Sequence, residues 1–181
     1  MKKILLVTLI SSFIIACGGG DGGSTANAEK PTPVPIETKE QIELRLNLPA
    51  EPKASEVDAT ILGVDSNTNG VRDELDRKVG FAFPNNEYAR KLFTRQAKIW
   101  TEMVENQDDI SKLRDLIKEK WIMLECTSKL DDTPEIKSFY SEIFGDVYER
   151  SKLHYNLKVK AQYRYQNTDQ SIIDDYCESF R

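Results

Sequence analysis

The chain has 181 residues, with 30 Asp or Glu against 25 Lys or Arg, and its formal net charge is −5. This acidic balance argues against nucleic acid as a partner, because nucleic-acid binding needs a concentrated basic face. The sequence also lacks a Gly-x-Ser-x-Gly elbow, a His-Glu-x-x-His pair and a Gly-rich phosphate loop, so we do not expect an enzyme.

Residues 1–16 are expected to be a signal peptide. Two lysines precede an apolar run, residues 4–15, which is too short to cross the ~30 Å hydrocarbon core of a bilayer as a helix. The four residues that end at Cys17, Ile-Ile-Ala-Cys, resemble the lipobox of bacterial lipoproteins. In that family the cysteine sulfur receives diacylglycerol and the signal is cut before it. The alternative is an ordinary secretory signal followed by a chance cysteine.

This resemblance implies lipidation at Cys17, with fatty acids such as palmitate, and hence the membrane as a partner through the anchor. Two or three acyl chains hold a protein stably, because each buried methylene contributes ~0.8 kcal/mol. In that family an Asp directly after the cysteine retains the protein in the inner membrane, whereas Gly18 stands there in this chain. We therefore expect the protein in the bacterial cell envelope, at the outer membrane facing the periplasm.

Residues 17–48 are expected to form a flexible tether after the lipidated cysteine. Their composition is first Gly-rich and then Pro-rich, which favours a flexible coil and polyproline II over a packed core. Near the end of this segment, residues 42–46 alternate apolar and charged side chains like a short strand. Residues 49–80 then hold a lead-in and a candidate metal loop, and residues 81–181 hold the predicted helices.

Residues 65–76 match the pattern of a calcium loop. Calcium takes six to eight oxygen ligands, which an EF-hand loop supplies from positions 1, 3, 5, 7, 9 and 12, with a Gly at position 6 for the sharp turn. Gly70 occupies position 6. The predicted Ca²⁺ ligands are the side chains of Asp65, Asn67, Asn69, Asp73 and Asp76 and the backbone carbonyl of Val71. The alternative is an Asn- and Gly-rich turn that caps the following helix.

The loop departs from paired EF-hands at two positions. Position 12 is Asp76 and not a bidentate Glu, and position 8 is Arg72, where paired loops place an apolar residue. A single Asp-rich loop of this kind resembles those of thrombospondin type-3 repeats and dockerins. Residues 58–73 also resemble a group of uncharacterised bacterial lipoproteins that carry one such loop ahead of a Cys-containing helical domain. That resemblance implies no known activity.

The remainder of the chain predicts a mainly α fold, a small antiparallel helical bundle. A short helix is expected from Asp73 to Val79, and apolar side chains recur at helical spacing in three later segments. We expect these to begin at Asn85 or Asn86, at Asp108 or Asp109, and at Thr133 before Pro134. Their predicted apolar stripes are Tyr88, Leu92, Ile99, Trp100, Met103 and Val104; Ile110, Leu113, Leu116, Ile117, Trp121 and Leu124; and Ile136, Phe139, Tyr140, Ile143, Phe144, Val147 and Tyr148.

Two cysteines remain after Cys17. In an oxidising compartment Cys126 and Cys177 are expected to form a disulfide, and two free buried thiols are the alternative. A basic run near the end of the long helical segment, which includes Arg150 and His154, is interpreted as a solvated helix face.

These features favour a lipid-anchored, calcium-stabilised binding module of the periplasm or outer membrane, without catalytic activity. A periplasmic immunity-type inhibitor of a toxin is the alternative, and a carboxylate-dependent hydrolase is a third hypothesis. Removal of the signal leaves 23 basic and 30 acidic residues, a formal charge of −7. The sequence does not identify a protein partner.

Overall fold

The structure is a computed structural model that describes residues 37–130, 139, 142–143, 148–163 and 167–181. The chain divides into two compact units, Met1–Pro35 and Ile36–Arg181, and every described residue belongs to the second. The predicted signal peptide, Cys17 and the first part of the predicted tether lie outside the described residues. The described residues contain helices and no strand, so the predicted mainly α class is confirmed.

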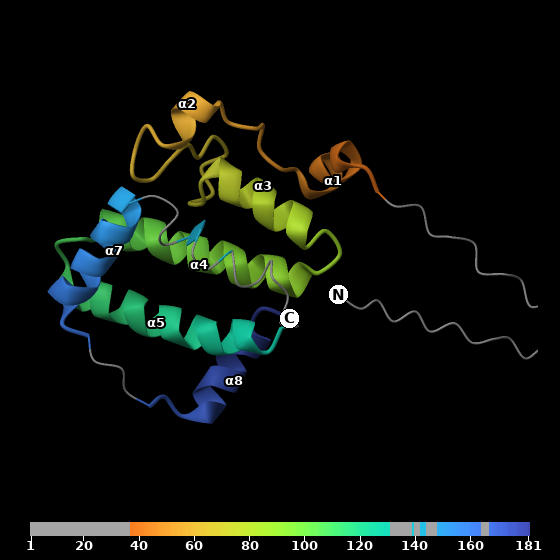
Figure 1. The fold of residues 1–181 in the computed structure, drawn as a ribbon. Helices are drawn as coiled ribbons and strands as arrows, with labels where there is room; N and C mark the ends of the chain where they lie inside the picture. Colours follow the sequence, from red (N-terminus) through yellow and green to blue (C-terminus); the bar gives the residue numbers. More distant parts are fainter. Residues whose placement is uncertain (1–36, 131–138, 140–141, 144–147, 164–166) are drawn as a thin grey trace, which may run out of the picture. The chain divides into compact units, whose positions relative to one another are not determined.

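The second unit is a small helical bundle (Figure 1). Its helices are α1 Lys39–Leu46, α2 Ala54–Val57, α3 Asp73–Ala82, α4 Glu87–Glu105, α5 Ile110–Ser128, α7 Tyr148–Ala161 and α8 Gln170–Glu178. The two longest, α4 and α5, run side by side, and α5 also packs against α7 and α8. On the other side of α4 lies α3, which in turn carries α1. The candidate metal loop thus leads into α3, a helix that packs directly on α4.

Side-chain caps fix where the two long helices begin. The side chain of Asn86 accepts a hydrogen bond from the N–H of Ala89 at 3.0 Å, and that of Asp109 accepts one from Lys112 at 2.9 Å. Each cap satisfies one of the backbone donors that a helix leaves unpaired at its start. For each helix the sequence offered two neighbouring caps, and the structure uses the second.

The core lies mainly between α4 and α5. Its largest fully buried apolar side chains include Phe93, Leu92, Ile99, Met103, Leu113, Leu116, Ile117 and Met123. Most of the predicted stripe positions on these two helices are buried. Tyr88, Val104, Ile110 and Trp121 are only partly buried and cover the edge of this core.

The predicted strand at residues 42–46 is wrong, because these residues belong to α1. Thr38 and Gln41 form a capping box, in which the Thr38 N–H donates to the Gln41 side chain at 2.9 Å and the Gln41 N–H donates to the Thr38 hydroxyl at 3.3 Å. Along the helix Ile42 is buried but Leu44 is 85% exposed. The apolar alternation therefore does not mark one buried face. Helix α1 also lies inside the segment that we expected to be tether.

Helix α3 is longer than predicted and includes Gly80. A Cβ at this position would lie 2.8 Å from the side-chain carbons of Leu48, which packs onto the glycine from the turn after α1. Gly80 therefore permits a close contact between two segments and does not end the helix. Two hydrogen bonds from Arg77 support the same contact, one to the Pro49 carbonyl at 2.8 Å and one to the Glu43 carboxylate.

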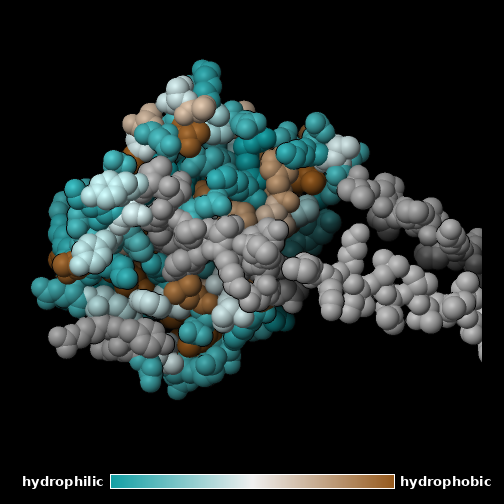
Figure 2. All heavy atoms as spheres, viewed as in Figure 1, coloured by the Kyte–Doolittle hydropathy of each residue, from teal (hydrophilic) through white to brown (hydrophobic). Residues whose placement is uncertain are grey.

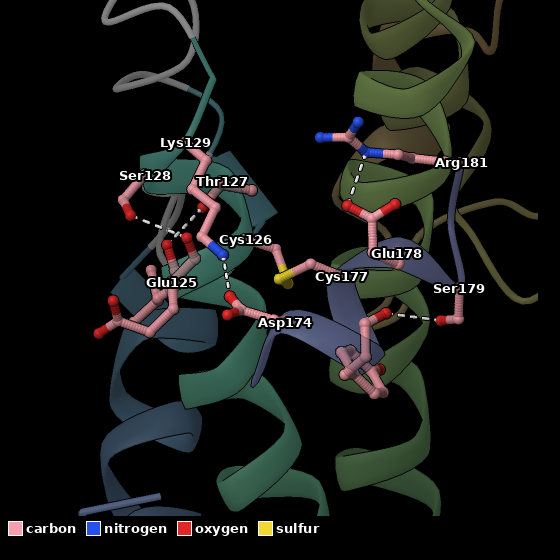
Figure 3. The surroundings of a disulfide bond; sticks show 12 residues. Glu125, Cys126, Thr127, Ser128, Lys129, Asp174, Cys177, Glu178, Ser179 and Arg181 are labelled. Atoms are coloured by element: carbon pink, nitrogen blue, oxygen red, sulfur yellow. Dashed lines mark hydrogen bonds and ion pairs between the residues drawn. A yellow bond between two sulfur atoms is a disulfide. The ribbon is translucent and has the colours of Figure 1, made fainter. Parts of the chain in front are cut away.

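Cys126 and Cys177 are brought together as predicted, at disulfide-bonding distance. Their sulfurs lie 2.01 Å apart and their Cα atoms 5.3 Å apart, across 51 positions of sequence. Cys177 lies on α8, a helix that the sequence did not predict. Beside the sulfurs, Lys129 binds Asp174 with an Nζ–Oδ1 distance of 2.6 Å (Figure 3). Both contacts hold the last helix against the end of α5.

The predicted start at Thr133 lies outside the described residues, as do Ile136, Tyr140, Phe144 and Val147. Phe139 and Ile143 are buried, as their places in the predicted stripe require. Tyr148 is not part of the core, since it is 72% exposed at the first turn of α7. The prediction extended the stripe one turn too far.

The visible surface of the second unit is mainly hydrophilic, with hydrophobic residues in small separate patches (Figure 2). Among the described helices, none combines the length and the apolar character that crossing a bilayer would require.

Candidate calcium loop

The candidate loop lies between Val64 and the first turn of α3. Its two ends are joined by a backbone hydrogen bond from the N–H of Asp73 to the carbonyl of Val64, 2.7 Å long. Gly70 has φ +84°, a conformation that L side chains rarely adopt. The glycine predicted for the sharp turn therefore has the conformation that the turn needs.

The Asp65 carboxylate is held at the centre of this turn by backbone donors. One oxygen accepts the N–H of Asn69 at 3.1 Å, and the other accepts the N–H of Gly70 at 2.8 Å. The amide oxygen of Asn69 in turn accepts the N–H of Val71 at 2.8 Å. These bonds fold the backbone around the side chains of Asp65 and Asn69 and fix the direction in which each side chain points.

The remaining predicted ligands are held in the same way. The amide oxygen of Asn67 accepts the N–H of Asn69 at 3.2 Å, and Asp73 accepts the N–H of Ser66 at 3.0 Å. Val71 and Asp73 are both buried. Four of the five predicted ligand side chains thus belong to one hydrogen-bonded turn, and Asp76 is the fifth.

Asp76 closes the turn from the first turn of α3. Its carboxylate accepts hydrogen bonds from the side-chain amides of both Asn67, at 3.3 Å, and Asn69. Burial raises the pKa of Asp76, and the negative charges of Asp65 and Asp73 raise it further, against the lowering effect of the two amide bonds. The three carboxylates therefore lie close enough to repel one another, which a bound cation would relieve.

The donor set fits calcium, which prefers oxygen ligands. A carboxylate or amide oxygen has a second lone pair, so an oxygen that already accepts a backbone N–H can also bind a metal. Within the described residues, no group of three or more Asp, Glu, His or Cys side chains has by itself an arrangement that could hold a metal ion. The loop differs from such a group because amide and carbonyl oxygens complete its set. Calcium binding stays a prediction.

The sequence did not predict that the loop is tied to α4. The hydroxyl of Thr101, in the last third of that helix, donates to the Gly70 carbonyl at 2.9 Å. Because α4 is the central helix of the bundle, this bond couples the position of the loop to the core. A lone threonine among the polar positions of an amphipathic helix carries no signal for such a bond.

Arg72, which departed from the EF-hand pattern, has a role within the domain. Its side chain is buried, its Nε lies 2.7 Å from a Glu74 carboxylate oxygen, and its guanidinium donates to the Glu142 carbonyl. In a paired EF-hand an apolar residue at this position contacts a partner loop. Here the arginine instead joins the loop to the residues that follow α5.

Arg150 on α7 contradicts the interpretation of a solvated basic face, because it is completely buried. Its guanidinium donates to the carbonyls of Ile61 at 2.9 Å and Val57 at 3.1 Å and to the Asp58 carboxylate at 3.0 Å. It thereby fixes the turn that leads into the candidate calcium loop. Arg150 also lies 3.9 Å from Glu74, the partner of Arg72.

A periodic signal for this buried face was present in the sequence. Arg150, His154, Leu157 and Ala161 recur at spacings of four, three and four, and they form the inner side of α7. Two of the four are ionisable, so a search for apolar residues misses the stripe.

His154 and Lys120 form a second polar contact inside the bundle. The Lys120 Nζ lies 2.8 Å from the His154 Nε2, between α5 and α7, and the Trp100 ring meets the histidine edge-on. Burial lowers the pKa of Lys120 to about 7, with a further contribution from the charge of Lys158. Burial and the same two lysines lower the pKa of His154 to about 3. The only histidine of the chain is therefore a neutral packing residue at pH 7.

Comparison of this chain with known protein families, with curated proteins and with solved structures finds no match in any of the three.

Proposed function

We propose that the protein is a lipid-anchored, calcium-stabilised binding module at the periplasmic side of the outer membrane, without catalytic activity. Lipid attachment would occur at Cys17. Calcium would be held by Asp65, Asn67, Asn69, Asp73 and Asp76 and by the carbonyl of Val71.

The observation that carries the calcium proposal is the hydrogen-bonded arrangement of the loop. Backbone N–H groups hold the side-chain oxygens of Asp65, Asn67, Asn69 and Asp73 within one turn around Gly70. Backbone donors orient four of the five predicted ligand side chains, and the side-chain amides of Asn67 and Asn69 orient the fifth, Asp76. The disulfide pair supports export, because disulfides persist in oxidising compartments.

The role of the ion would be structural. The loop connects the lead-in, which Arg150 holds, to α3, and its glycine carbonyl is bound by α4. A cation that neutralises the three carboxylates would stabilise all of these contacts together. With only three charged ligands the affinity should be that of extracellular calcium modules, on the order of 10⁻⁴ M.

The test is calorimetric titration of calcium chloride into the purified protein, with thermal unfolding in parallel. At a calcium concentration 100 times the dissociation constant, the free energy of unfolding should rise by about 2.7 kcal/mol. Magnesium should have much less effect, because it requires octahedral geometry at shorter distances.

Asp65→Ala should abolish both the heat of binding and the stabilisation, because it removes a carboxylate that also organises the backbone of the turn. The matched control is Asp115→Ala, which removes a carboxylate from an exposed position of α5 and should leave calcium binding unchanged. A wild-type protein that gives no calcium heat and no change of melting temperature would show that the loop is only a turn.

A further inference from the structure

A pocket of about 380 Å³ borders the calcium loop. Three of the predicted ligands, Asn67, Asn69 and Asp76, form part of its lining. The rest of the lining comes from α3, from the turn after α1 and from the first half of α4. The loop is therefore open to this pocket on the side where Asp76 closes it.

An ion in the loop would leave room for an outside ligand. Calcium takes six to eight oxygens, and position 9 of such loops often binds through water. At position 12 Asp76 has a shorter side chain than the bidentate Glu of EF-hands. With position 9 bound through water and Asp76 through one oxygen, the loop would supply about five direct oxygens, and at least one place would remain for another ligand. Because Asn67 and Asp76 line the pocket, an oxygen from a molecule in the pocket can fill such a place.

Two cations on α4 also line the pocket. The Arg90 guanidinium is held in position by hydrogen bonds to the carbonyls of Phe83, 2.6 Å, and Pro84, 2.8 Å. The Lys91 Nζ lies 2.9 Å from Glu87, a side chain that is 69% exposed. An exposed pair of this kind contributes little, so a ligand carboxylate can replace Glu87 as the partner of Lys91.

The pocket wall between these charged groups includes apolar side chains. Leu46, Leu48 and Val79 line it, and Leu48 is fixed by its close contact with Gly80. A short methylene chain would pack on this surface. The volume is near the lower end for ligand pockets, which fits a small molecule.

We infer that this pocket binds a small aliphatic dicarboxylate, with one carboxylate on the loop-bound calcium and the other on Lys91 and Arg90. The inference rests on the proposed calcium site. It assigns the calcium a second role, as part of the binding site that the module presents.

The experiment uses the purified full-length protein in detergent and has two stages. Calcium chloride is titrated first, which tests the loop alone. Succinate is then titrated into the calcium-loaded protein and, separately, into protein treated with a chelator. We expect succinate to bind the calcium-loaded protein and to bind at least about tenfold more weakly without calcium, because one of its two charge-assisted contacts is lost.

Lys91→Glu should leave calcium binding unchanged and weaken succinate binding by about tenfold or more, and Lys91→Gln should give a smaller loss. The matched control is Lys118→Glu, which makes the same charge change at an exposed position of α5 that does not line the pocket. Calcium binding without succinate binding, or succinate binding that Lys91→Glu does not weaken, would overturn the inference and leave the calcium site intact. Absence of calcium binding would overturn both.

Discussion

Arg150 holds the lead-in of the candidate calcium loop from a distance of about ninety positions in the sequence. Its guanidinium donates to the backbone carbonyls of two partly buried residues, Val57 and Ile61, and it pairs with Asp58. Leaving such acceptors unpaired costs about 1–3 kcal/mol for each group. A buried arginine in this environment is therefore expected to be among the most sensitive positions of the domain.

We predict that Arg150→Met, which keeps much of the side-chain volume, lowers the free energy of unfolding by about 3 kcal/mol. Calcium affinity should also fall, because the turn before Asp65 loses its support. Urea denaturation measures the first effect and calorimetry the second. The control is Lys152→Met at an exposed position of the same helix, and equal stability of the two variants would contradict the role of Arg150.

His154 offers a direct test of the packing between α5 and α7. Burial and the nearby lysines lower its pKa from 6.5 to about 3, so the folded state binds fewer protons than the unfolded state between these values. The free energy of unfolding is therefore unaffected by His154 above pH 6.5. It falls as the pH is lowered from 6.5 toward 3, by at most about 1.4 kcal/mol per pH unit.

Two measurements check this prediction. The imidazole nitrogen resonances of the single histidine should keep the values of a neutral ring between pH 8 and 5, and His154→Gln should lose less stability than the wild type over pH 6.5 to 5. A titration midpoint near 6.5 would mean that the histidine is exposed in solution.

At the scale of single residues, the sequence predicted those residues whose roles depend on local geometry. Asn86 and Asp109 cap helices within three residues, and Gly70 adopts its positive φ within the loop. Arg150, Arg72 and Thr101 act on segments remote in the chain, and no local pattern specifies their partners. The charge of Arg150 also favoured the opposite prediction, a solvated face.

At the scale of elements, periodicity predicted the helices that carry wide apolar stripes. Helices α4 and α5 are of this kind, whereas α1 buries only Ile42. Helix α1 is stabilised by its capping box and by contacts with α3, and periodicity detects neither of these. Helix α8 was missed for a similar reason, since only Ile173 and Cys177 are buried along it.

The disulfide connects two of these elements, α5 and α8. Closing a loop of 51 positions is expected to contribute at most about 4 kcal/mol through the entropy of the unfolded chain. We predict that replacing both cysteines by alanine destabilises the protein by up to this amount, with α8 the first helix to lose protection from hydrogen exchange. Non-reducing peptide mapping of the exported protein should recover both cysteines in one linked fragment. Two alkylatable thiols in the folded protein would contradict the pairing.

At the scale of the whole molecule, the sequence predicted the fold class but not how the segments of the bundle contact one another. Three amphipathic segments with short connections indicate a bundle, and the described residues form one. The sequence did not show that the lead-in is fastened to α7, because that contact depends on a buried arginine. It also did not show that the loop borders a pocket formed with α1 and α4.

The proposed membrane attachment would concern the whole chain and would depend on one sulfur atom, that of Cys17. We predict that Cys17→Ser keeps the apolar run but abolishes lipid attachment, so that the unprocessed precursor accumulates. Incorporation of radiolabelled palmitate measures this, with Cys177→Ser as a control that should still be labelled. Equal labelling of the wild type and Cys17→Ser would contradict the lipoprotein proposal.

If the protein is exported as proposed, the separation of Cys126 and Cys177 would also affect the order in which its cysteines can pair. The chain contains three cysteines, and Cys177 is the last to be synthesised, 51 positions after Cys126. During that interval the only earlier thiol that Cys126 can meet is Cys17. Three cysteines allow three pairings, and only one of them joins α5 to α8. Acylation of Cys17 would convert its thiol into a thioether, which would remove both incorrect pairings.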